Sequence, residues 1–277
     1  MKRIVLCADD YGQAPNISAG IINLIKAKRL TAASCMVNAP DWAEHAANLR
    51  SLRDQVDIGL HFNLTHGRAL SPAYAEKYGV DFQPISSVLR RAFLRQFDAK
   101  IIADELKKQL EMFEKTLGFA PNFIDGHQHI HHFPVIRDAI FSVYHERFLA
   151  KKTYLRLVNM PIKFSDFPEN LKKIIIFLTG VLPFKRRLEQ EKIPHNIDFT
   201  GIYSFARAEN FKQLFPKFLQ EINDHGLIMC HPGLASQDAK DPIFAARFHE
   251  YEYLMSDKFL VDCAAKDVVL TRFFVEK

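Results

Sequence analysis

The sequence predicts an α/β fold in which a mostly parallel sheet closes, fully or partly, into a (β/α) barrel. Short apolar runs alternate with helical patterns of ten or more residues, which is typical of parallel strands joined by crossover helices. The chain has 277 residues, a length that suits one barrel domain. A doubly wound open sheet is the alternative. Because the sequence shows no linker, internal repeat or low-complexity tract, residues 1–277 are expected to form a single domain.

The predicted strands are short apolar runs, several with β-branched residues, that end at polar or turn residues. The first is RIVLCA at residues 3–8, which two acidic residues follow directly. Later strands are expected at 31–37, 57–64, 122–126, 154–158, 226–233 and 267–273.

Helical patterns fill most of the intervals between these strands. NISAGIINLIKAK at 16–28 has an apolar face, with Asn16 as a candidate N-cap. An amphipathic helix over 98–117 is expected to end at Gly118, a typical C-cap residue. Residues 67–85 are rich in Pro, Tyr, Ser and Gly and predict an irregular excursion over the surface. Further helices are expected at 41–52, 134–149, 211–223 and 244–256.

The composition narrows the choice of partner and compartment. The net charge is +5, but the basic residues are scattered, so nucleic-acid binding is not expected. The four cysteines form no CxxC pair and are expected to be reduced core thiols. No run reaches the ~20 apolar residues of a membrane span. The apolar run near the N-terminus is too short for a signal peptide, so a cytoplasmic location is expected.

Aspartate and histidine residues lie at the ends of several of the predicted strands or directly after them. The carboxyl ends of parallel strands in a barrel converge on one face, so these side chains are expected to meet in one cleft. Aspartate and histidine are also ligands for a divalent metal ion. The residues are Asp9 and Asp10 after the first strand, His61 in the third, Asp125, His127 and His129 after the fourth, and His231 in the penultimate strand.

This set of side chains suits metal-assisted hydrolysis. One aspartate and two histidines can hold an ion and leave positions open for water or substrate. Of the adjacent Asp9 and Asp10, one can hold the metal while the other takes a proton from metal-bound water. His231 can protonate a leaving amine.

Each feature also has a purely structural interpretation. An Asp-Asp pair before Tyr-Gly suits a turn or an N-cap. His61 alone is typical of a hydrogen-bonded core histidine, and the histidine-rich run 127–132 of a solvated loop. Taken together, these structural interpretations explain the sequence less well than one shared site does, because all the features lie at the carboxyl ends of strands.

Four motifs, in this order, resemble the YdjC-like carbohydrate deacetylases, a family that includes the chito-oligosaccharide deacetylases. The motifs are ADDYG at 8–12, GLHFNLT at 59–65, DGHQHIHHFP at 125–134 and MCHPG at 229–233. The resemblance extends from residue 3 to about residue 256 and includes a looser pattern of Arg247, Glu250 or Glu252, and Leu254.

The resemblance implies a distorted, TIM-barrel-like (β/α) barrel that removes the N-acetyl group of an amino-sugar-containing carbohydrate, an oligosaccharide or a glycoconjugate. It implies one divalent metal ion, zinc or magnesium, and a homodimer. The implied metal ligands are Asp10, His61 and His127, with Asp9 as general base and His231 as general acid. The implied substrate contacts are Asn63, His129 and Arg247.

The stretch 171–205 contains a basic, apolar run that maps to no motif except loosely at IDFTGIYSF. As a helix it is expected to pack in the core, to cover the cleft, or to contact a membrane surface through residues 171–193. Two other functions stay open. A metal-dependent phosphoesterase on the same scaffold would recruit a second ion, and a non-catalytic sugar-binding protein would need none.

Overall fold

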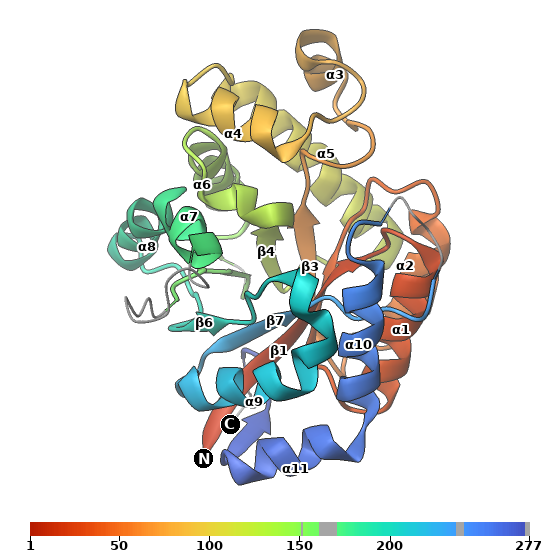
Figure 1. The fold of residues 1–277 in the computed structure, drawn as a ribbon. Helices are drawn as coiled ribbons and strands as arrows, with labels where there is room; N and C mark the ends of the chain where they lie inside the picture. Colours follow the sequence, from red (N-terminus) through yellow and green to blue (C-terminus); the bar gives the residue numbers. More distant parts are fainter. Residues whose placement is uncertain (151, 161–170, 237–240, 275–277) are drawn as a thin grey trace.

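Eight parallel strands form one curled sheet in the described part of the chain, which in this computed structural model comprises residues 1–150, 152–160, 171–236 and 241–274. The sheet is a distorted barrel in a single α/β domain, as predicted (Figure 1). Its strand order is β5-β4-β3-β2-β1-β7-β6, and β8 pairs with the start of β1. The strands are β1 (Lys2–Tyr11), β2 (Ala32–Cys35), β3 (Asp57–Phe62), β4 (Phe123–Gly126), β5 (Tyr154–Leu155), β6 (Phe199–Thr200), β7 (Leu227–Cys230) and β8 (Val268–Leu270).

Helices surround the sheet, and the start of β1 lies beside β8 near α11 (Figure 1). No helix among the described residues is long and apolar enough to cross a membrane. The α-helices are α1 (Pro15–Lys26), α2 (Trp42–Arg50), α3 (Pro72–Tyr78), α4 (Ile85–Phe93), α5 (Ala99–Leu117), α6 (Ile136–Arg147), α7 (Leu171–Leu178), α8 (Val181–Gln190), α9 (Phe211–Glu221), α10 (Phe244–Met255) and α11 (Asp257–Ala265). The 3₁₀ segments in the described ranges are η1 (His127–His132) and η3 (Phe205–Asn210).

Two local predictions were wrong. The first helix begins at Pro15 with Ala14 as its N-cap, so Asn16 lies inside the first turn. Proline suits this position because its φ is already helical and it needs no hydrogen-bond acceptor. The stretch 67–85 contains α3, whose first turn is capped by the Ser71 hydroxyl. Gly118, by contrast, is confirmed as a C-cap, with a left-handed φ of 85°.

The edge strands β5 and β6 approach each other through the segment that precedes β6. Leu155 forms a parallel bridge with His195. The backbone N–H of Phe199 donates to the carbonyl of Asn159, at 3.0 Å. These contacts bring the two edges of the curled sheet together.

The apolar core has two parts, one on each side of the sheet. The larger packs between the strands and the surrounding helices. The smaller fills the barrel interior and includes Val5, Cys7, Phe123, Tyr154 and Met229. Because side chains alternate along a strand, the inward positions of each strand form one continuous line toward its carboxyl end.

The four cysteines are free and buried, as the prediction of core thiols requires.

Candidate active site

Polar side chains replace apolar ones at the carboxyl end of the barrel interior. On β1, Val5 and Cys7 belong to the inner core, and Asp9 continues the same line two residues further on. His61 and Asp125 are register partners on the neighbouring strands β3 and β4. The side chains of Asp9, His61 and Asp125 are all at least 98% buried.

Asp9 and Asp10 both face this cluster although they are neighbours on a strand, where side chains normally alternate between faces. Asp10 has a φ of 68°, and the register of β1 against β2 shifts at this point. The bulge lets the Asp10 carboxylate reach His127 while Asp9 binds Arg156. A positive φ at a non-glycine residue costs energy, and such strain is concentrated at functional sites.

Asp10, His61 and His127 form a group of donor atoms that could hold a metal ion. The Asp10 Oδ1 atom lies 3.0 Å from His127 Nδ1 and 3.4 Å from His61 Nε2. One donor atom from each residue lies within 4.8 Å of the other two. The three side chains come from β1, β3 and η1, which are distant in sequence.

His61 is oriented by groups behind it. Its Nδ1 atom lies 2.7 Å from the Asp125 carboxylate, to which Ser34 also donates a hydrogen bond of 2.6 Å. A proton on Nδ1 leaves the Nε2 lone pair directed toward Asp10, as a metal-binding histidine requires. Burial disfavours the charged imidazole, but Asp125 and Asp9 outweigh it and raise the pKa of His61 to about 10. The site thus attracts positive charge at the place where His61 Nε2 points.

Arg156 lies beneath the cluster and is fully buried. Its guanidinium binds Asp9 through two hydrogen bonds of 2.7 Å and contacts Asp125 at 2.7 Å. Asp9, His61 and Asp125 also satisfy the distances of a metal site. Arg156 occupies both oxygens of Asp9, whereas Asp10 keeps Oδ1 directed at the two histidines, so the group containing Asp10 is the better candidate for an ion.

Arg247 of α10 supports Asp10 from the other side. Its Nη2 atom donates to Asp10 Oδ2 at 2.8 Å, and its Nε atom donates to Asp241 at 2.7 Å. Burial opposes ionisation of Asp10, but Arg247 and His127 overcome it and hold the pKa of Asp10 well below its usual range. Asp10 is therefore a carboxylate at neutral pH.

His231 follows β7 directly and is half-buried. Its backbone N–H donates to Glu250 at 2.5 Å, and its imidazole meets the ring of Phe205 edge to face, with centroids 5.5 Å apart. Glu250 also accepts a hydrogen bond from the hydroxyl of Tyr203, at 2.6 Å.

Two further predicted substrate contacts, Asn63 and His129, lie after β3 and in η1. The Asn63 amide donates to Asn38 and to the carbonyl of His66, and its oxygen accepts the His66 N–H, so it organises the loop after β3. His129 is nearly buried, and its ring meets that of Phe199 edge to face.

The last two histidines of the 127–132 run point into the protein. His131 Nε2 lies 3.1 Å from the carbonyl of Arg156. The rings of His131 and His132 both pack against Phe184 of α8. Burial lowers the pKa of both imidazoles, so they are neutral packing groups.

Two residues of the site, Arg156 and Asp241, were not identified from the sequence, and Glu250 was given no role there and was not distinguished from Glu252. Arg156 had a usable signal, because it is a charged residue inside the apolar run YLRLV. Asp241 and Glu250 lie in or near a helix where acidic residues are ordinary, and no local pattern marks them as buried.

Three comparisons relate this chain to known proteins. The family described as YdjC-like protein matches residues 3–265. The chain is 35% identical over 138 residues to a carbohydrate deacetylase of Mus musculus, covering 48% of this chain and 44% of the relative. It is 31% identical over 150 residues to a chitooligosaccharide deacetylase of Yersinia pestis (strain Pestoides F), covering 53% of this chain and 58% of the relative. The chain therefore spans about half the length of the curated relatives it matches.

One solved structure is similar over nearly the whole chain. It is a protein of Enterococcus faecalis V583 with a proposed role in cellobiose-phosphate cleavage. The two chains superpose with a TM-score of 0.74 at 19% identity, covering 98% of this chain and 97% of the other. This likeness supports the fold.

Proposed function

The chain belongs to the YdjC-like protein family, and from that premise we propose that it is a metal-dependent carbohydrate N-deacetylase, a hydrolase acting on an amide C–N bond. Its substrate would be a carbohydrate with an N-acetylated amino sugar, an oligosaccharide or a glycoconjugate. The observation that carries the proposal is the group of Asp10, His61 and His127 donor atoms beside a second, arginine-bound carboxylate, Asp9.

Asp10, His61 and His127 would hold one divalent ion. Two imidazoles and one carboxylate are a common zinc donor set, whereas magnesium favours oxygen ligands. Three protein ligands leave positions open for water and substrate, as in catalytic sites. Such an ion, when bound, polarises a carbonyl and lowers the pKa of water. The raised pKa of His61 indicates a site that favours a cation, and the lowered pKa of Asp10 keeps this ligand ionised.

The other side chains would move protons and hold the ligands in place. Asp9 would accept a proton from the attacking water, while Arg156 keeps its carboxylate oriented. His231 would donate a proton to the departing amine. Because Asn63 and Arg247 make hydrogen bonds within the protein, we propose that they act on the substrate through the loop after β3 and through Asp10, respectively. His129 would line the site behind His127.

The experiment is an acetate-release assay on a panel of N-acetylated oligosaccharides with added zinc, magnesium or manganese. We expect turnover that a chelator removes. Asp9→Asn should lower kcat by at least about 1,000-fold, because it removes the general base, while metal stays bound. Asp10→Ala should lower metal affinity instead. The control is Asp257→Asn, whose side chain is fully exposed. A normal rate for Asp9→Asn would contradict the assignment of the base.

The phosphoesterase alternative requires a second ion. The only further donor group among the described residues is Asp9, His61 and Asp125, and Arg156 binds both of its carboxylates. This favours one ion per chain and hence the deacetylase. Elemental analysis separates the three hypotheses: one ion supports the deacetylase, two support phosphoester chemistry, and none supports a sugar-binding protein.

Three expectations about partners and location stay predictions: a homodimer, a cytoplasmic location, and contact with a membrane surface through 171–193. For the last, α7 and α8 bury Val181 and Phe184 but leave Ile175, Leu178 and Leu182 exposed. Sedimentation with anionic lipid vesicles tests it. Leu178→Gln should weaken the binding if this face makes the contact.

A further inference from the structure

Helix α10 presents two buried charged residues to different parts of the site. Arg247 and Glu250 are three residues apart, so they lie on one face of the helix. Arg247 is 2% exposed and Glu250 is 0% exposed. Arg247 supports Asp10, as described above, whereas Glu250 has no role in the mechanism proposed so far.

The Glu250 carboxylate joins three separate parts of the chain. One oxygen accepts the backbone N–H of His231, at 2.5 Å, and the other accepts the Tyr203 hydroxyl, at 2.6 Å. His231 follows β7, Tyr203 lies in the segment after β6, and Glu250 itself belongs to α10. Both oxygens of the buried carboxylate are therefore used.

The His231 backbone needs such a partner at this point in the fold. The ladder between β7 and β1 ends at Cys230, the residue before His231. The next residue is Pro232, which has no N–H to donate. The Gly233 N–H donates to the Arg247 carbonyl, at 3.0 Å. Helix α10 thus holds the chain on both sides of the proline after the strand has ended.

The imidazole of His231 is flanked by the same unit. Its ring meets Phe205 edge to face, and the Phe205 ring in turn packs against Tyr203, with centroids 5.1 Å apart. Glu250 therefore touches the His231 backbone directly and reaches the aromatic neighbour of its ring through Tyr203.

We propose that Glu250 is a positioning residue for His231, holding the backbone amide of the proton donor and, through Tyr203, the aromatic ring beside the imidazole. The proposal rests on the deacetylase function, in which His231 protonates the leaving amine. If Glu250 acts by positioning His231, then replacing Glu250 should lower kcat more for a substrate whose leaving group must be protonated than for one whose leaving group departs as an anion.

The test compares Glu250→Ala and Glu250→Gln on two substrates. An N-acetyl sugar releases an amine that must be protonated, whereas 4-nitrophenyl acetate releases an anion that departs without a proton. Glu250→Ala should lower kcat on the sugar by about 100-fold, with KM and metal content unchanged, because a positioned acid contributes that order of rate. On the aryl ester it should lower kcat by only a few-fold.

Glu250→Gln is the matched control, because its amide oxygen can accept the His231 N–H while its NH₂ group donates to the Tyr203 oxygen. It should recover most of the rate on the sugar. His231→Ala should show the same dependence on the leaving group, and adding Glu250→Ala to it should cause little further loss. Equal losses on both substrates, or no loss on either, would overturn the positioning role.

A second readout does not depend on activity. The short bond to a carboxylate should move the His231 backbone amide proton downfield in NMR spectra of protein labelled with ¹⁵N-histidine. Tyr203→Phe should leave this resonance nearly unchanged, and Glu250→Ala should move it upfield. If wild-type protein releases no acetate from any sugar, the proposed function fails. If the resonance does not move in Glu250→Ala, the Glu250 contact fails.

Discussion

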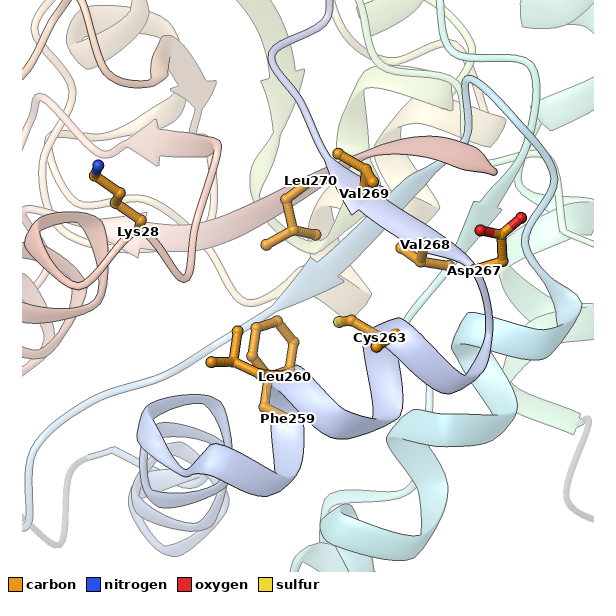
Figure 2. Close-up of a pocket in the computed structure, with 9 residues that line it drawn as sticks. Lys28, Phe259, Leu260, Cys263, Asp267, Val268, Val269 and Leu270 are labelled. Carbon is orange, nitrogen blue, oxygen red and sulfur yellow. The ribbon is translucent and has the colours of Figure 1, made fainter.

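The two ends of the barrel bury different kinds of side chain, although one sheet builds both. At the carboxyl end, Asp9, His61, Asp125 and Arg156 form an almost fully buried ionic cluster. At the other end, a hollow of about 510 Å³ lies between α11 and β8, lined mainly by apolar residues (Figure 2). Its lining includes Phe259, Leu260, Cys263 and Val268, with Lys28 and Asp267 as its charged members.

This difference shows how each end is stabilised. Apolar side chains at the β8 end each contribute in proportion to the area they bury, so the loss of one leaves the others intact. In the ionic cluster each charge is tolerated only because a neighbour neutralises it. Removing one partner there leaves another buried charge without compensation, so single substitutions should cost more.

The largest effect is expected for Arg156→Met, which removes the guanidinium that binds both Asp9 and Asp125. The two buried carboxylates would then share only the charge of the His61 imidazole. The free energy of unfolding should fall by about 3–5 kcal/mol, and turnover should be lost because Asp9 is no longer oriented. Urea denaturation and the acetate assay measure the two effects.

Arg156→Lys separates the effect of the positive charge from the effect of the hydrogen bonds. Lysine keeps the positive charge but cannot form the paired hydrogen bonds of the guanidinium. Its stability should lie between wild type and Arg156→Met, while activity stays strongly reduced. An Arg156→Met protein as stable as wild type would contradict the view that this end depends on charge compensation.

A smaller effect is expected from the pH dependence at Glu250, the buried acid beside His231. Burial raises its pKa from 4.5 to about 7, against the hydrogen bonds from Tyr203 and the His231 amide. Between these two values the folded chain holds a proton that the unfolded chain has released. Stability therefore falls as the pH rises from about 4.5 to 7, by about 3 kcal/mol for this group.

Glu250→Gln should remove that part of the slope, because an amide does not titrate in this range. Relative to wild type, the variant should gain about 3 kcal/mol between pH 4.5 and 7.5, measured by urea denaturation at both pH values. Glu252→Gln on the exposed face of the same helix is the control and should leave the slope unchanged. Parallel curves for wild type and Glu250→Gln would show that Glu250 does not stay protonated on folding.

The sequence predicts the barrel better than it predicts the buried partners of the site, for a physical reason. Alternating strand and helix patterns reveal the barrel because each segment shows its own periodicity. Acidic and imidazole groups at the ends of apolar runs indicate a polar cluster, and the family resemblance selects Asp10, His61 and His127 from it. The partners are harder to predict, because local sequence shows Arg156 only as a charge and the family pattern does not distinguish Glu250 from Glu252. Their burial depends on which strands meet around the barrel, and that is a property of the closed sheet.

The same limit explains the short elements that prediction missed. β6 (Phe199–Thr200) has only two residues, and its pairing with β7 depends on the neighbouring strand. The excursion over 67–85 was predicted as irregular because its composition is rich in turn residues, yet Ser71 and Pro72 begin a helix there. Their Ser-Pro pair is an N-terminal signal that the overall composition of the stretch conceals.

The smallest effect is expected at the β8 end of the barrel. Leu260 lines the hollow, and its side chain is 49% exposed (Figure 2). Leu260→Gln loses little buried apolar area, so the free energy of unfolding should change by no more than about 0.5 kcal/mol. Metal content and kcat should stay at wild-type values, because no charge of the ionic cluster is left unpaired. If this substitution lowered metal affinity, the two ends would be coupled through the strands, and the contrast between additive packing and charge compensation would not hold.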